Sequence, residues 1–161
     1  LGSNPGVVTW TFNMRQQQAN PSGFASGNYG AAFILVGTSG TTNSVGTGYA
    51  VTLGNAGKTD PLKLVRYSGG LQTATQILAS NTLGLSDFGN AYLSVKVTYT
   101  PSTNTWQLFV RNDGTAFLDP NSGSLTSQGT AVNSTYASSV LPIMGAFWNA
   151  STIHSFSTFR P

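Results

Sequence analysis

The four acidic residues of the chain decide which hydrolytic chemistry it could perform. There is no glutamate, and the acids are Asp60, Asp87, Asp113 and Asp119. Retaining glycoside hydrolysis needs two carboxyl groups about 5–5.5 Å apart, which a β-strand supplies when acids alternate on one of its faces. No two of these aspartates lie within five residues of each other. A glycosidase would therefore need two acids from distant segments, for example Asp87 with Asp113.

The aspartates could instead hold turns or bind a hard cation. Asp60 and Asp119 each precede a proline, an arrangement typical of turns because aspartate bonds the nearby backbone and proline sets the next φ. Asp87 shares a short loop with other oxygen-bearing side chains, among them Asn90. Because calcium accepts such oxygens together with backbone carbonyls, a calcium site is an open alternative, with Asp60, Asp87 and Asp113 as its candidate ligands. Turn-forming roles are the favoured interpretation.

The chain contains few residues that could perform nucleophilic catalysis or bind zinc. His154 is the single histidine and there is no cysteine, whereas a zinc site needs three or four such ligands. His154 lies in an expected strand, where a packed, hydrogen-bonded imidazole is favoured over a general base. A catalytic triad would also need a serine and an aspartate beside it.

The composition points to a neutral partner. Ser, Thr, Asn and Gly make up 72 of the 161 residues, and only 7% of residues are charged, against about 25% in an average globular protein. Sugars offer C–H faces that stack on aromatic rings and hydroxyl groups that bond to amides, hydroxyls and arginine. Most strand aromatics are core residues, so Trp10 and Trp106 are expected in the core. The candidate carbohydrate-binding residues are Trp148, Asn149, Asp87, Asn90, Tyr49 and Arg66.

The charge pattern argues against two other classes of partner. The seven cations are scattered singly and the net charge is only +3, whereas nucleic-acid binding needs a clustered basic face. No run approaches the roughly 20 apolar residues that cross a bilayer, so membrane insertion is not expected. The composition favours an extracellular or cell-surface setting. We expect one domain over residues 1–161, excised from a larger secreted or surface protein whose other domains are further candidate partners.

The periodicity is that of β-strands along the whole chain. Alternating patterns and short apolar runs, bounded by Gly, Pro, Asn and Ser, predict strands at residues 7–14, 30–36, 48–54, 62–67, 92–99, 105–111, 143–148 and 153–159. The one helix candidate, at residues 72–78, is short and weak. Strands at this spacing with almost no helix predict an all-β sandwich.

Two of these strands show clear faces. In the hairpin formed by 92–99 and 105–111, Leu93, Val95, Val97 and Tyr99 should face inward, because every second residue of a strand lies on the same face. In 62–67 the same alternation places Leu62, Leu64 and Arg66 on one face and Lys63, Val65 and Tyr67 on the other.

The order of the segments resembles a known superfamily. GTGYAVTL at 46–53, the strand pair 92–99 and 106–111, and MGAF at 144–147 leading to HSFSTF at 154–159 are similar to the pattern of the concanavalin A-like lectin/glucanase superfamily, which includes legume lectins and laminin-G-like domains. More closely, NYGAAFILVGTS, GYAVTLGN, DPLKLVRYSGGL, YLSVKVTYTPSTNTW and MGAFWN look like a LamG-like module of very large secreted or surface proteins of gliding, polymer-degrading Bacteroidota.

The resemblance implies a jelly-roll β-sandwich of two antiparallel sheets, one of them concave, with a binding or adhesive role. In legume lectins an aspartate of the corresponding GDG segment bonds the sugar, and Thr47 stands at that position here, which argues against a legume-type monosaccharide site. Because one fold hosts many functions, the functional hypotheses come from the residues as well.

Three functional hypotheses remain at this point. The first is a non-catalytic carbohydrate-binding or adhesion module of an extracellular or cell-surface protein, with a polysaccharide or glycan as partner. The second is a structural spacer or assembly module of an adhesin or filament. A glycoside hydrolase is the least favoured. A binding site could also lie in the loops at 38–47 and 118–135, where sequence patterns are least informative.

Overall fold

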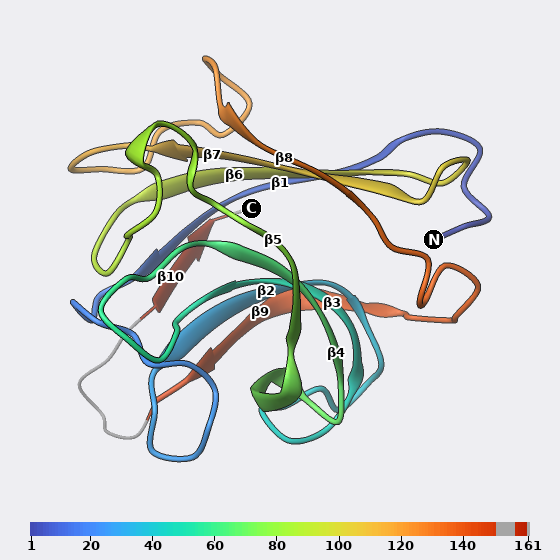
Figure 1. Ribbon diagram of the computed structural model, residues 1–161, viewed down its shortest axis with the longest axis horizontal. Coiled ribbons are helices and arrows are strands. Elements are labelled where there is room, and N and C mark those ends of the chain that lie inside the picture. The colour runs from blue at the N-terminus through green and yellow to red at the C-terminus, as the bar shows by residue number, and fades with distance from the viewer. Residues whose placement is uncertain (151–156, 161) are drawn as a thin grey trace.

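The computed structural model describes residues 1–150 and the backbone of residues 157–160. In this part of the chain, two antiparallel sheets of five strands each face one another as an all-β sandwich (Figure 1). His154 and the first part of the expected strand 153–159 lie outside the described residues. No helix among the described residues is long and apolar enough to cross a membrane.

Each sheet combines strands that are distant in the sequence. Sheet A contains, in spatial order, β10 (Ser157–Arg160), β1 (Val8–Gln16), β6 (Leu93–Thr100), β7 (Thr105–Asn112) and β8 (Thr126–Val132). Sheet B contains, in spatial order, β5 (Thr75–Ala79), β4 (Lys63–Ser68), β3 (Thr47–Leu53), β2 (Gly30–Gly37) and β9 (Ile143–Asn149). Two short 3-10 turns, η1 (Leu71–Thr73) and η2 (Thr82–Gly84), flank β5.

The expected weak helix at 72–78 is wrong. Residues 72 and 73 belong to η1 and residues 75–78 to β5, which pairs with β4 so that Leu78 lies opposite Leu64. In β5 two exposed polar residues, Thr75 and Gln76, are followed by two half-buried apolar ones, Ile77 and Leu78. Polar and apolar residues therefore do not alternate, and the sequence shows neither strand nor helix periodicity. Strand β8 was not expected, because its small polar residues show no alternation. It is a strand because it pairs with β7.

The hairpin β6–β7 has the expected inward face. Leu93, Val95, Val97 and Tyr99 are all fully buried between the sheets. Asn104 in the connecting loop adopts a positive φ of 53°, and its Oδ1 accepts a hydrogen bond of 2.7 Å from the Tyr99 hydroxyl. Asparagine tolerates this left-handed conformation better than most residues, so the turn chemistry and the strand pattern agree.

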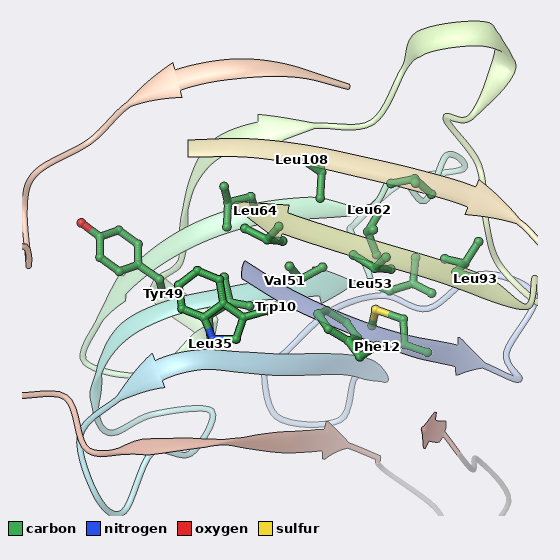
Figure 2. Packing of buried hydrophobic residues seen from close by; sticks show 14 of the residues in the cluster. Trp10, Phe12, Leu35, Tyr49, Val51, Leu53, Leu62, Leu64, Leu93 and Leu108 are labelled. Atoms are coloured by element: carbon green, nitrogen blue, oxygen red, sulfur yellow. The ribbon is translucent and has the colours of Figure 1, made fainter. Parts of the chain in front are cut away.

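The main core lies between the two sheets, and Figure 2 shows Tyr49 and Trp10 close together at one end of it. Trp106 is fully buried, with ring centroids 4.5 Å from Tyr49, 4.6 Å from Tyr99 and 5.9 Å from Trp10. Its indole Nε1 donates to the carbonyl of Asn133 at 3.1 Å. Trp10 and Trp106 are therefore core residues, as expected.

A second apolar cluster lies on the opposite side of sheet B, facing away from sheet A. Val65 and Tyr67 belong to it, whereas Leu62 and Leu64 belong to the main core, as the alternation in this strand predicts. The cluster comprises Phe24, Ala32, Ile34, Ala50, Val65, Tyr67 and Leu71. Since these side chains are buried, loops must cover this outer face of sheet B. The cluster is therefore a second part of the hydrophobic core.

Two of the covering segments are held together by backbone hydrogen bonds. The amides of Leu71 and Gln72 donate to the carbonyls of Thr42 and Asn43 at 3.1 and 2.8 Å. Gly70 allows this approach, because its φ is +90° and a Cβ there would lie 2.5 Å from the backbone nitrogen of Ser44. The turn η1 is therefore fixed against the loop at 41–46.

Candidate functional site

A groove of about 300 Å³ lies on the outer face of sheet B. Its floor is formed by Thr52, Lys63, Val65 and Gln76, which share one face because Thr52 pairs with Lys63 and Val65 pairs with Gln76 across the strands. The loop at 22–28 forms one wall, and Gln72 with Ala74 forms the other. The groove is thus built on strands and bordered by fixed loops.

The side chains that line the groove are amides, hydroxyls, apolar groups and one cation. Asn28 and Asn55 are partly committed, since the Nδ2 of Asn28 donates to the Ser22 carbonyl at 3.1 Å and the Nζ of Lys63 donates to Asn55 Oδ1. Gln72 and Gln76 are exposed, and their side-chain amides form no hydrogen bond within the described part of the chain. These two amides are free to bond a ligand.

The apolar part of the floor is Val65 and Leu71, both buried beneath the groove with Phe24 beside them. No aspartate is among the described lining residues. A groove of this kind, with amide donors and acceptors above a small apolar floor and without negative charge, suits an uncharged polar ligand.

Asn149 positions one wall of this groove. Its Nδ2 lies within hydrogen-bonding distance of three carbonyls of the loop at 22–28, those of Gly23 at 3.4 Å, Ala25 at 2.9 Å and Asn28 at 3.2 Å. Because Asn149 pairs with Gly30 at the edge of sheet B, its amide ties the loop to β9. We expected Asn149 to contact a ligand directly, and its side chain instead holds the loop.

Trp148 lies on the other face of β9. It pairs with Ala31, a residue of the main core, so its side chain is on the face of sheet B that is turned toward sheet A. The side chain is 57% exposed. Trp148 is therefore accessible to solvent, but it is not among the described residues that line the groove.

Asn90 belongs to a separate cluster at sheet A. Its Oδ1 accepts hydrogen bonds from Arg15 Nε at 3.2 Å and Nη2 at 2.7 Å. The Arg15 guanidinium lies 4.1 Å above the Tyr92 ring, which contacts Phe117 edge-on at 4.9 Å between centroids. This arrangement holds Asn90 against Arg15, and Asn90 is not among the described residues that line the groove.

Tyr49 and Arg66 lie at the opposite end of the sandwich from Asp87, Asn90 and the loop at 22–28. They are paired across β3 and β4, and Arg66 is half-buried. Tyr49 is fully buried; its hydroxyl donates to Asn133 Oδ1 at 2.7 Å and accepts from the Tyr136 amide at 3.1 Å. Burial raises the pKa of the Tyr49 phenol. Its ring has no free face, so Tyr49 cannot stack on a sugar, contrary to our expectation.

The structure brings Asp60 and Asp87 together and leaves Asp113 elsewhere. The Asp60 amide donates to Asp87 Oδ1 at 3.2 Å. Asp60 is fully buried, and neither of its carboxylate oxygens has a hydrogen-bond partner. Burial, and then the nearby Asp87 charge, raises the pKa of Asp60. Among the described residues, no three His, Cys, Asp or Glu side chains form a cluster that could hold a metal.

Asp113 is fully occupied by other partners. Its Oδ1 accepts from Arg111 Nε at 2.7 Å, and its Oδ2 accepts from Ser94 Oγ at 2.7 Å and from the Leu118 amide at 3.0 Å. The expected set of three candidate metal ligands therefore reduces to the pair Asp60 and Asp87.

The residues that line the groove were not predicted from the sequence. Lys63 and Val65 were assigned to one face of a strand, but nothing in the sequence indicated that this face borders a groove. Gln72 and Gln76 fell in the segment expected to be a weak helix. Gln76 lies beside Val65 only because β4 pairs with β5. The alternation in 62–67 was therefore the one sequence feature that could have indicated any of the groove residues.

Comparisons with known proteins leave the family open. No model of a protein family matches this chain, and no curated protein gives a significant match.

Proposed function

We propose that this protein is a non-catalytic carbohydrate-binding module and that the groove on the outer face of sheet B is its site. The observation that carries the proposal is the pair of exposed amides, Gln72 and Gln76, beside Lys63 and above the apolar floor of Val65 and Leu71. Amides bond sugar hydroxyls as both donors and acceptors, and an apolar floor accommodates the C–H face of a sugar ring.

The groove is also preorganised. Gln72 is anchored through its backbone to Asn43, Gln76 extends from a paired strand, and Asn149 holds the opposite wall. A site that is fixed before binding loses less conformational entropy when the ligand arrives. Its volume of about 300 Å³ is at the lower end for small-ligand sites, which favours a short segment of a polysaccharide chain.

The finer fold assignment is part of this proposal. The segment order supports a jelly roll of the concanavalin A-like superfamily, and the low content of charged residues, 7%, supports an extracellular or cell-surface setting. Both fit a binding module carried by a larger exported protein.

The positions of the aspartates support a non-catalytic role. Asp60 is fully buried, and the side chain of Asp113 is fully buried in its ion pair with Arg111. Asp87 and Asp119 are exposed, and they lie on different loops. Hydrolysis would need two carboxyl groups that both reach the sugar. Two buried aspartates, and two exposed ones on different loops, favour binding over catalysis.

The test is a depletion assay on a panel of insoluble and soluble polysaccharides, scored for both bound protein and released sugar. We expect the protein to be retained on at least one polysaccharide without sugar release. The double variant Gln72→Ala/Gln76→Ala should bind about tenfold more weakly, because two ordinary hydrogen bonds together contribute about 1.4 kcal/mol.

The matched control is Gln107→Ala, since Gln107 is a glutamine on the outer face of sheet A. It should bind as tightly as the wild type. Released sugar would overturn the non-catalytic role, equal weakening by the control would overturn the groove as the site, and no retention on any polysaccharide would favour a structural module.

A structural or assembly module is the second candidate function, and β9 favours it. This strand is one of the two edge strands of sheet B as described, and Met144 and Trp148, on one of its faces, are 62% and 57% exposed. Exposed edge strands with apolar residues are sites of association between chains. A concentration-dependent mass in light scattering that Trp148→Ser abolishes would support this function.

A further inference from the structure

The carboxylate of Asp60 is the least satisfied charged group in the described part of the chain. It is fully buried, and neither of its oxygens accepts a hydrogen bond of normal geometry. The Asn55 amide acts on this carboxylate, but it donates to the Pro21 carbonyl at 2.7 Å. Leaving a charged group buried and unpaired destabilises a fold strongly. The side chain therefore needs either a bound proton or a cation.

A second carboxylate lies beside it. Asp87 Oδ1 accepts the amide of Asp60 at 3.2 Å, and the amide of Phe88 donates back to the Asp60 carbonyl at 3.0 Å. These two bonds hold the loop at 85–90 against the start of β4. Asp87 is exposed, so an ion from solvent can reach the pair.

The nearby lysine does not neutralise this pair. Lys63 is the cation whose charge acts on Asp60, but its Nζ donates to Asn55 Oδ1. The ion pair found among the described residues is the one between Arg111 and Asp113. Two carboxylates and one ammonium group leave the cluster with a net negative charge.

We infer that Asp60 and Asp87 form a calcium site that joins the β3–β4 loop to the loop at 85–90. Calcium takes six to eight oxygen ligands from carboxylates, backbone carbonyls and water, so two carboxylates and the oxygens of two loops suit it, whereas zinc would require nitrogen or sulfur ligands.

Neither Asp60 nor Asp87 lines the groove, so the calcium site does not depend on the proposed sugar contacts. Asn55, which lines the groove, belongs to the same loop as Asp60, and its Nδ2 donates to the Ala56 carbonyl at 3.1 Å. Calcium should therefore stabilise the fold whether or not the groove binds a glycan.

The experiment measures thermal unfolding of the chelator-treated protein in CaCl₂ and in EDTA, together with calorimetric titration of CaCl₂ alone. We expect calcium at about 100 times its Kd to raise the unfolding midpoint by about 5 °C. Asp87→Asn should fold, because its side chain is exposed, and it should lose this shift. Asp60→Asn removes the other carboxylate and should lose it as well.

The control is Asp119→Asn, which changes an exposed aspartate on a different loop and should keep the full shift. The site is overturned if the wild type unfolds at the same temperature in CaCl₂ and EDTA and titrates without heat, the result expected if Asp60 carries a proton instead. It is also overturned if both Asp87→Asn and Asp60→Asn respond to calcium as strongly as the wild type.

Discussion

Arg111 and Asp113, two residues apart, form an ion pair with 2.7 Å between Nε and Oδ1. The Arg111 guanidinium also donates to Ser94 Oγ at 2.8 Å and to the carbonyls of Asp119 and Ser122, the first of these at 3.1 Å. This network folds the segment after β7 back over the outer face of sheet A. It explains why Ser94, on that outward face of β6, is fully buried.

Breaking this pair should destabilise the protein strongly. Asp113→Ala leaves the Arg111 guanidinium without its carboxylate and also removes the acceptor of the Leu118 amide. We expect a loss of about 3 kcal/mol in the free energy of unfolding, measured by urea denaturation. Asp119→Ala is the control, because its exposed carboxylate bonds only to the Asn121 amide among the described residues, and it should lose less than about 1 kcal/mol. Equal losses in both variants would contradict this role for the network.

The tryptophans Trp106 and Trp148 should respond oppositely to substitution. Trp106 is fully buried among three aromatic rings, so Trp106→Ala should lose about 3–5 kcal/mol. Trp148 is 57% exposed, so Trp148→Ala should lose less than about 1 kcal/mol. Acrylamide quenching provides a second measurement, since most of the quenchable fluorescence should disappear in the Trp148→Ala variant. Quenching that is unchanged in this variant would show that Trp148 is covered in solution.

The stability of the protein should fall above pH 10. Burial raises the pKa values of Tyr49, Tyr67 and Tyr99 above the ordinary value of 10.0. Since the unfolded chain then loses these protons first, their contribution to stability is fully present below pH 10 and is lost as the pH rises through the folded-state pKa values. Urea denaturation between pH 8 and pH 11 measures this fall.

The variant Tyr49→Phe separates this titration from general alkaline damage. It removes the hydroxyl that bonds Asn133 and Tyr136, so it should be less stable than the wild type at pH 8. Its stability should nevertheless fall less steeply above pH 10, because one titrating group is gone. A slope as steep as that of the wild type would exclude Tyr49 as a contributor.

The substitution Asn149→Ala tests the wall of the groove. It removes the amide that contacts the carbonyls of Gly23, Ala25 and Asn28. We expect faster proteolysis within residues 22–28 and a loss of about 1–2 kcal/mol in stability. If the groove is the glycan site, binding should weaken as well, although Asn149 is outside the residues that line it. Asn112→Ala, at an exposed asparagine that bonds Gly114 across a turn, is the control and should leave proteolysis at 22–28 unchanged.

The candidate site was only partly predictable from the sequence. The aspartate pair was among the three expected metal ligands, because oxygen-rich loops are visible in the sequence, but their proximity depends on a hydrogen bond between residues 27 positions apart. Tyr49 was expected to contact a sugar, because strand alternation cannot show that a second sheet covers a given face. Gln76 was missed because its role depends on β5 pairing with β4.

The sequence by itself determined the strands with strong alternation, the inward face of β6, and a surface of hydroxyls and amides with few charges, because these features depend on local periodicity and composition. Tertiary structure decided which strands pair, that β5 and β8 are strands at all, and which side of sheet B carries a groove. Such features depend on contacts between distant segments, such as Asn149 with the loop at 22–28 and Asp60 with Asp87. Periodicity within one strand carries no information about these contacts.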